Sequence, residues 1–227
     1  MRFADFPLRD RKRARTRVAL VAALVPRLAQ RPLDDIGVAE LCAEAEVSQG
    51  TFFNHFATKG ELLTHYVQLW SLEVGLQARR DPRGASDPLA AIEGLYLATA
   101  AEVSAHPRVM LEIIAHQARH PTGPAAPIEL VERLLFLDDA PEAEGLSDQG
   151  LYGLLTEWLG RAVAQGALPA SSDLDQLTLA AASVFFGVPL LVGWEQPQAI
   201  GPLYQAQLGL VWAGAWARWG GGAPVSP

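Results

Sequence analysis

The sequence contains a single cysteine, Cys42, which excludes a disulfide framework and a multi-cysteine zinc site and favours a reducing compartment. Charged residues are also sparse, at 19% of the chain, whereas 50% of the residues are hydrophobic. A large core is therefore available, and global disorder is excluded. The N-terminus is polar and arginine-rich, so no secretory signal is expected and the protein is expected in the cytoplasm.

The sequence also lacks the motifs of common enzymes. It has no nucleophile elbow, P-loop or dinucleotide-binding fingerprint, so no catalytic residue, cofactor or metal ion is predicted. Glu112, His116 and His120 follow each other at intervals of four residues, and a metal ion could use such a helical face. Pro121 places His120 in a fraying turn, which favours a partly polar pocket wall or a solvated face. A small helical metal-dependent enzyme that uses His116 and His120 stays the alternative function.

Charge is distributed unevenly along the chain. The net charge is −7, but residues 1–60 carry +3 and residues 61–227 carry −10. The positive charge is concentrated in one basic run, opposed locally only by Asp10, and its members are Arg9, Arg11, Lys12, Arg13, Arg15 and Arg17. Such a run is either a solvated helix start or a surface for phosphates, where binding weakens as salt rises.

Apolar residues recur with helical spacing along most of the chain, and no run alternates apolar and polar residues. The predicted helices after the first, which lies around residues 18–29, cover residues 38–45, 48–56, 58–79, 88–104, 107–119, 128–137, 149–165, 173–193 and 203–219. Ser48 is expected to be an N-cap, and residues 81–84 are expected to be a break. The sequence therefore predicts an all-α fold of about nine or ten helices.

Residues 176–194 contain no charged residue, and Glu195 follows directly after them. The segment could therefore lie in a membrane or in the interior of the protein. A stretch of this length could span a bilayer, so a membrane-associated helical protein is a further alternative. The segment also contains Gln176, Thr178, Ser183 and Pro189, and its apolar residues trace a helical stripe. A helix that is buried or forms a subunit interface is therefore favoured, and no membrane partner is predicted.

Residues 37–56 have the pattern of a helix-turn-helix, in which the second helix lays its N-terminal residues in the DNA major groove. Its apolar residues supply the buried side. Cys42 lies on that side, so an unreactive, packed thiol is favoured over a redox sensor. Gln49 and Asn54 can bond adenine, and Thr51 can reach a phosphate or a thymine methyl.

The residues 38–42, 47–56 with the letters VSQGTFFNHF, and 58–63 resemble the N-terminal domain of the TetR family of transcriptional regulators. The resemblance implies a three-helix DNA-binding domain at 14–74, with its helix-turn-helix at 37–56, and an effector-binding and dimerisation domain at 75–219. The resemblance also implies that the protein is not an enzyme. Residues 1–8 and 220–227 are expected to be flexible.

The resemblance also implies which residues contact DNA. The recognition helix would present Ser48, Gln49, Thr51, Phe53, Asn54 and His55, and Lys59 would contact phosphate at the start of the next helix. Arg11, Lys12, Arg13 and Arg15 would add backbone contacts. For His55, a structural histidine packed beside the motif is the favoured alternative.

Three residues depart from the family pattern. Phe53 stands where tyrosine is usual, and Gly37 stands where threonine or serine is usual, so each change removes a hydroxyl that could bond phosphate. Glu46 stands where glycine is usual and must adopt a strained backbone conformation or reshape the turn. Each departure is expected to weaken DNA binding by about 1 kcal/mol.

For the remainder of the chain the resemblance implies a homodimeric repressor on a palindromic double-stranded operator, released by a small lipophilic or aromatic effector. The dimer interface is expected on the helices at 149–165 and 173–193, with Trp158, Phe185, Phe186 and Leu190 as candidate residues. The effector pocket is expected among residues 62–165. Its candidate residues are Trp70, Met110, His116 and Trp158.

Overall fold

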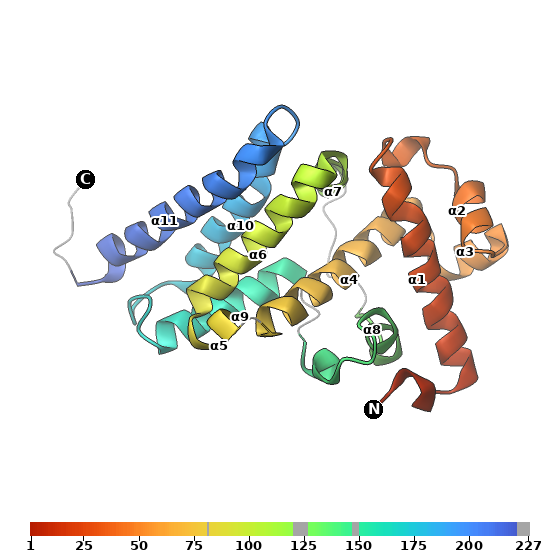
Figure 1. The fold of residues 1–227 in the computed structure, drawn as a ribbon, viewed down its shortest axis with the longest axis horizontal. Coiled ribbons are helices and arrows are strands. Elements are labelled where there is room, and N and C mark those ends of the chain that lie inside the picture. Colours follow the sequence, from red (N-terminus) through yellow and green to blue (C-terminus); the bar gives the residue numbers. More distant parts are fainter. Residues whose placement is uncertain (81, 120–126, 147–149, 222–227) are drawn as a thin grey trace. The chain divides into compact units, whose positions relative to one another are not determined.

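The computed structural model describes residues 1–80, 82–119, 127–146 and 150–221, and every regular element in these ranges is helical (Figure 1). No strand occurs among these residues, which confirms the predicted all-α fold. The chain divides into two compact units, each made of two stretches of sequence. The first unit comprises Met1–Leu76 and His106–Gly150, and the second comprises Gln77–Ala105 and Leu151–Pro227.

The first unit contains the helices that the helix-turn-helix pattern predicted. Its elements are η1 (Phe3–Asp5), α1 (Leu8–Leu28), η2 (Leu33–Asp35), α2 (Val38–Glu44), α3 (Gln49–His55), most of α4 (Lys59–Arg80), α7 (Pro107–Arg119), α8 (Leu130–Phe136) and η3 (Pro141–Gly145). The bounds of α2, α3 and α7 agree with the sequence prediction within one residue. Local capping and periodicity therefore determine these helices.

Buried apolar side chains from both stretches of sequence share the core of the first unit. Leu20 and Leu24 of α1 pack in one cluster with Phe52 of α3 and with Ile113 of α7 and Leu134 of α8. This shared core is the reason that residues 106–150 belong to the first compact unit. The predicted domain boundary at residue 74 follows the sequence motif, and it remains a proposal.

The N-terminal residues 1–8, for which the sequence predicted flexibility, include the 3-10 helix η1. The Phe3 amide donates a hydrogen bond to Asp139 Oδ1, and the Arg15 guanidinium lies 5.2 Å from the centre of the Phe3 ring. These contacts hold η1 in the first unit. In the predicted flexible segment 220–227, residues 222–227 lie outside the described residues.

The second unit contains α5 (Pro82–Ser86), α6 (Pro88–Ala105), α9 (Gly150–Ala164), α10 (Leu174–Val192), η4 (Pro197–Ala199) and α11 (Ile200–Trp219). Helix α11 packs against both α6 and α10 (Figure 1). The short helix α5 occupies the stretch that the sequence predicted as a break. Pro82 is its first residue, a position where proline loses no helical hydrogen bond and its backbone angle already suits a helix.

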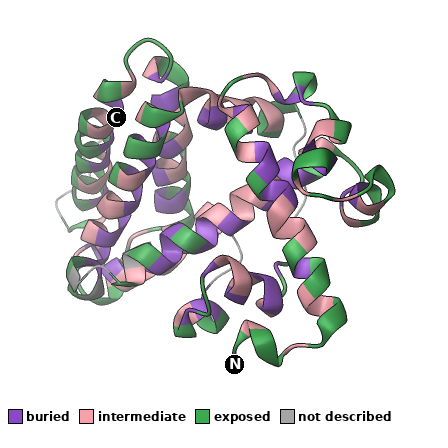
Figure 2. Ribbon diagram, turned by 45° about the vertical axis from the view of Figure 1, so that its right-hand side comes forward, coloured by how far each residue is buried: buried purple, intermediate pink, exposed green. Residues whose placement is uncertain are grey.

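Aromatic side chains fill the core of the second unit, and its helices bury one side and expose the other (Figure 2). Tyr96 of α6, Phe185 of α10 and Tyr204 of α11 form edge-on and stacked ring pairs with centroids 4.9–6.1 Å apart. Trp158 of α9 is also buried. The second unit therefore has an aromatic core of its own.

A proline inside α10 explains one hydrogen bond in this core. Pro189 has no amide hydrogen, so the carbonyl of Phe185, four residues earlier, loses its helical partner. The Tyr204 hydroxyl donates to that carbonyl at 2.6 Å. Burial raises the pKa of Tyr204 above the ordinary tyrosine value, so the hydroxyl keeps its proton for this bond.

We expect Tyr204→Phe to lower the free energy of unfolding by about 1–3 kcal/mol, because the buried Phe185 carbonyl would lose its donor. Tyr96→Phe is the matched control. The Tyr96 hydroxyl donates to the Ala181 carbonyl at 2.6 Å, and the Phe185 amide is placed to bond the same carbonyl within the helix. Urea unfolding of both variants measures the difference, and equal losses of stability would contradict this account of Pro189.

Within the described residues, one helix is long and apolar enough to span a membrane, namely α10. Only 33% of its most apolar window is buried. Its inner side packs within the second unit, where Leu177, Ala181 and Phe185 are buried. One such helix is weak support for a membrane span, because the core helix of a helical bundle has the same composition.

Candidate nucleic-acid interface

Helices α2 and α3 and the turn between them form the centre of the candidate site. Ser48 caps α3, and its hydroxyl accepts a hydrogen bond from the Thr51 amide at 3.0 Å, which confirms the predicted N-cap. Phe52 is buried under the helix, whereas Gln49, Phe53 and Asn54 are exposed. The predicted recognition helix therefore presents polar side chains outward from a fixed apolar base.

The turn after α2 depends on a residue that is not glycine. The Val47 amide bonds the Cys42 carbonyl at 2.9 Å and the Glu46 amide bonds the Ala43 carbonyl at 3.4 Å, which is the Schellman arrangement. This arrangement needs a left-handed residue at Glu46, whose φ is 54°. The sequence left open whether Glu46 adopts a strained backbone or reshapes the turn. The structure shows the strained backbone, and the turn keeps its usual geometry.

We expect Glu46→Gly to raise the free energy of unfolding by about 1 kcal/mol, because glycine adopts the left-handed conformation without steric cost. Glu46→Ala is the control, since it removes the same charge and keeps the strained backbone. Thermal and urea unfolding of the two variants measure the difference. A stabilisation by alanine as large as that by glycine would assign the effect to charge instead of strain.

The basic run and the recognition helix meet at one surface. A hollow of about 470 Å³ is lined by Arg9, Lys12, Arg13, Thr16, Asn54 and His55. Arg13 also forms an exposed ion pair with Glu129 at 3.1 Å. The half-buried Arg11 does not line the hollow, and its buried Nε has no hydrogen-bond partner among the described residues. Four cationic or polar side chains of α1 thus lie beside the C-terminal end of α3.

His55 occupies the boundary between this surface and the interior. Burial, and then the positive charges of Arg17 and Arg13, lower the pKa of His55 below its usual value of 6.5. The imidazole is therefore neutral at pH 7. A neutral ring can donate one hydrogen bond and accept another, which fits either of the two roles that the sequence left open for His55.

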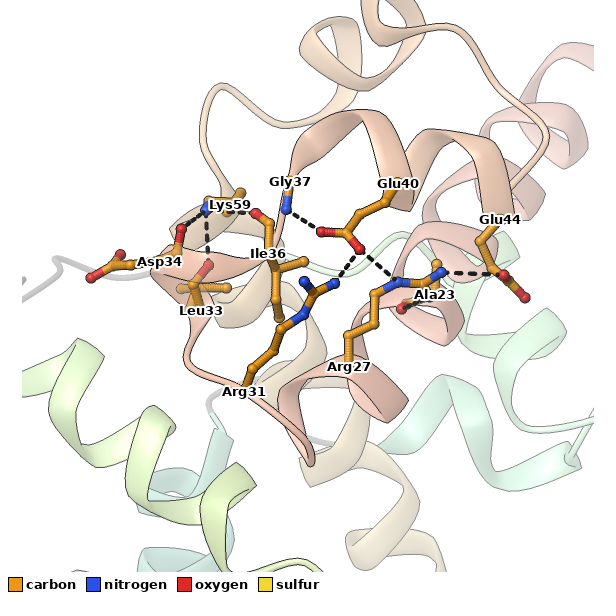
Figure 3. Close-up of polar contacts among 10 residues, drawn as sticks. All are labelled: Ala23, Arg27, Arg31, Leu33, Asp34, Ile36, Gly37, Glu40, Glu44 and Lys59. Atoms are coloured by element: carbon orange, nitrogen blue, oxygen red, sulfur yellow. Dashed lines mark hydrogen bonds and ion pairs between the residues drawn. The ribbon is translucent and has the colours of Figure 1, made fainter.

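Lys59 lies at the first position of α4 and points toward η2 (Figure 3). Its Nζ donates to the carbonyls of Leu33 at 2.8 Å, Asp34 at 3.0 Å and Ile36 at 2.7 Å. An ammonium group has three donors, so these three carbonyls use all of them. The sequence predicted that Lys59 contacts phosphate, whereas in the structure its donors face inward and hold the segment that leads into α2.

Glu40 supplies one half of a capping box at the start of α2 (Figure 3), whereas Gly37 has no side chain to accept an amide of the first turn. Its carboxylate accepts the Gly37 amide and also pairs with Arg31 and with Arg27, the latter at 3.5 Å. The Gly37 hydrogen bond, followed by the two arginines, lowers the pKa of Glu40. Sequence reasoning missed this role, although a glutamate three residues after an N-cap is the spacing of a capping box.

The residues expected in the effector pocket lie in different parts of the chain. Trp70 and Met110 belong to the first unit, and Trp158 belongs to the second. His116 lines a surface hollow of about 380 Å³ together with Lys59 and Gly60, and a side chain at Gly60 would collide with its ring. His116 therefore packs on the start of α4.

The candidate metal residues have other partners. The Glu112 carboxylate accepts the Leu33 amide at 3.2 Å, and His116 contacts Gly60. His120 lies outside the described residues. Among the residues that the structure describes, no group of three or more His, Cys, Asp or Glu side chains could hold a metal ion. Cys42 is a buried free thiol, and burial raises its pKa, which makes the reactive thiolate less accessible.

The residues expected in the dimer interface differ in exposure. Phe185 and Trp158 are buried in the second unit, Phe186 is half-buried, and Leu190 is 59% exposed. The large exposed apolar side chains of the second unit lie mostly on α10 and α11 and just after α10, at Leu179, Leu190, Leu191, Trp194, Leu210 and Trp216.

The sequence model of the bacterial regulatory proteins of the tetR family matches residues 20–66. No curated protein matches the chain. Among solved structures, the Thermus thermophilus TetR-family transcriptional repressor FadR, in complex with lauroyl-CoA, is 20% identical, with 93% of this chain and 99% of that chain covered and a TM-score of 0.64.

Two further structures have the same fold at lower similarity. RolR in complex with resorcinol is 18% identical, with 88% of this chain and 89% of that chain covered and a TM-score of 0.55. A TetR transcriptional regulator from Rhodococcus sp. RHA1 is 16% identical, with coverage of 88% and 96% and a TM-score of 0.52. The family match covers the helix-turn-helix and the start of α4, and family members are DNA-binding regulators and not enzymes. Residues 20–66 therefore match the tetR family of bacterial regulatory proteins, and the chain as a whole shares the fold of solved TetR-family regulators.

Proposed function

We propose that the protein is a cytoplasmic repressor that binds a palindromic DNA operator as a homodimer and leaves it when a small lipophilic or aromatic effector binds. The observation that carries the DNA part is the shared surface of α1 and α3. There Arg9, Lys12 and Arg13 can neutralise phosphates beside the groove that Gln49 and Asn54 would read. We propose that Ser48, Thr51, Phe53 and His55 complete this contact.

Exposed apolar side chains support a dimer through α10 and α11. A groove of about 430 Å³ between them has an almost wholly apolar lining that includes Val184, Val188 and Leu203. The sequence proposed the helix at 149–165 as the partner of α10. The apolar residues of α9, among them Leu155 and Trp158, pack inside the second unit, so we now propose α11 in its place. Twofold symmetry of such a dimer would require an approximately palindromic operator.

The class of effector is proposed from the related structures. FadR binds lauroyl-CoA and RolR binds resorcinol, which are an acyl thioester and a phenol. Acyl-CoA thioesters and simple phenols are therefore the first two classes to test. Release from DNA requires that the effector binds more tightly to a subunit arrangement that does not fit successive major grooves.

The test is selection of a binding site from a random double-stranded DNA library with the full chain. The proposal predicts a palindromic site bound by two subunits, with Asn54→Ala abolishing the preference at specific base pairs. Lauroyl-CoA and resorcinol are then titrated against the complex. If no sequence is enriched at low salt, the proposal that the protein binds a specific operator is wrong. If one subunit binds a single half-site, the proposal that it binds as a dimer is wrong. Unchanged operator affinity with both compounds would reject these two effector classes.

A further inference from the structure

A buried ionic cluster joins three helices of the first unit beneath the recognition helix. Arg17 of α1 lies between Glu132 of α8 and His65 of α4, with Arg17 Nε 3.1 Å from Glu132 Oε2 and Arg17 Nη2 2.9 Å from His65 Nδ1. His65 Nε2 also bonds Glu132 Oε1. Glu132 and His65 are each 3% exposed and Arg17 is 15% exposed, so water does not screen these contacts well.

The donors and acceptors of the cluster allow one arrangement. Arginine only donates, so His65 Nδ1 must accept from Arg17, and His65 Nε2 carries the hydrogen that it donates to Glu132. The Glu132 carboxylate therefore receives hydrogen bonds from both partners. Removal of this carboxylate would leave the guanidinium buried without a counter-charge, which proteins tolerate poorly.

Arg17 connects the cluster to the recognition helix. Its Nη1 donates a long hydrogen bond of 3.5 Å to the carbonyl of His55, which is the last residue of α3. The Arg17 guanidinium also lies 4.7 Å from the centre of the Phe56 ring, which is 5.3 Å from the ring of His65. A helix ends with unpaired carbonyls and a negative partial charge, so a cation at this point holds the end of α3 in place.

We propose that Glu132 is a positioning residue for DNA recognition. It fixes Arg17, and Arg17 holds the C-terminal end of α3 at the orientation that the major groove requires. This role rests on the proposed function of α3. Because Glu132 lies on α8, a shift of α8 would alter the position of α3 and thereby DNA binding. Neither Glu132 nor Arg17 lines the basic hollow, so neither is a phosphate contact in this proposal.

The test compares Glu132→Gln with Glu129→Gln. Both replace a carboxylate of the same region by an amide, but Glu129 pairs with Arg13 at the surface, where both side chains are about half exposed. We expect Glu132→Gln to weaken operator binding roughly tenfold or more and to speed amide exchange in α3 of the free protein by a similar factor. Glu129→Gln is expected neither to weaken operator binding nor to speed amide exchange in α3. In Glu132→Gln the slope of log affinity against log salt should stay at its wild-type value.

Arg17→Lys gives a second route if Glu132→Gln does not fold. Lysine keeps the charge opposite Glu132 but lacks the planar fork that reaches three acceptors at once, so it should lose operator affinity and α3 protection as well. The double variant should be no worse than either single variant. Wild-type exchange in α3 of folded Glu132→Gln or Arg17→Lys, or a shallower salt slope, would overturn the proposal. Because exchange is measured without DNA, failure of the wild type to bind any operator would refute the proposed function separately.

Discussion

Simultaneous replacement of Arg9 and Lys12 by alanine is expected to weaken operator binding about 100-fold at moderate salt. Both side chains line the hollow beside α3, and each lost phosphate contact costs about tenfold in affinity. The slope of log affinity against log salt should become shallower by about 1.8, because two fewer counterions are released. Filter binding or fluorescence anisotropy at four or more salt concentrations measures both quantities.

The control for this pair removes the same charge elsewhere. Arg2 and Arg218 do not line the hollow, and Arg218 lies against the Trp219 ring. The Arg2→Ala/Arg218→Ala variant should keep the wild-type salt slope and nearly the wild-type affinity. Equal weakening by both double variants would show that net charge, and not the surface shared by α1 and α3, attracts the DNA.

Lys59→Met is expected to lower the free energy of unfolding by about 2–3 kcal/mol. Methionine fills a similar volume but donates no hydrogen bond, so the carbonyls of Leu33, Asp34 and Ile36 would lose their shared charged donor. We expect the salt slope of DNA binding to stay unchanged in this variant. Urea unfolding and binding at several salt concentrations test the two parts separately.

The other lysine of the chain supplies the matched control. Lys12 is exposed on α1 and lines the hollow, so Lys12→Met should keep the stability of the wild type and make the salt slope shallower by about 0.9. The two lysines are thus expected to have opposite effects. A shallower slope in Lys59→Met would return Lys59 to the phosphate contact that the sequence predicted.

The sequence by itself determined the features that depend on neighbours within about four residues. Helical periodicity gave α2, α3 and α7 within one residue, and the hydroxyl of Ser48 gave the start of α3. At Glu46 the sequence narrowed the outcome to a strained backbone or a reshaped turn, and the structure shows the left-handed backbone. These features follow from rules of local geometry, which sequence spacing contains in full.

The tertiary structure decided which charged residues face inward. Lys59 and its three carbonyls are 23–26 residues apart, and Arg17 and Glu132 are 115 residues apart, so no spacing rule connects them. The same holds for α9 and α11, whose sequences are both apolar. In the structure α9 buries Leu155 and Trp158, whereas α11 leaves Leu210 and Trp216 exposed. Whether an ionic or apolar side chain serves the interior or a partner depends on what long-range folding places beside it, because burial and charge pairing are properties of the surroundings and not of the residue.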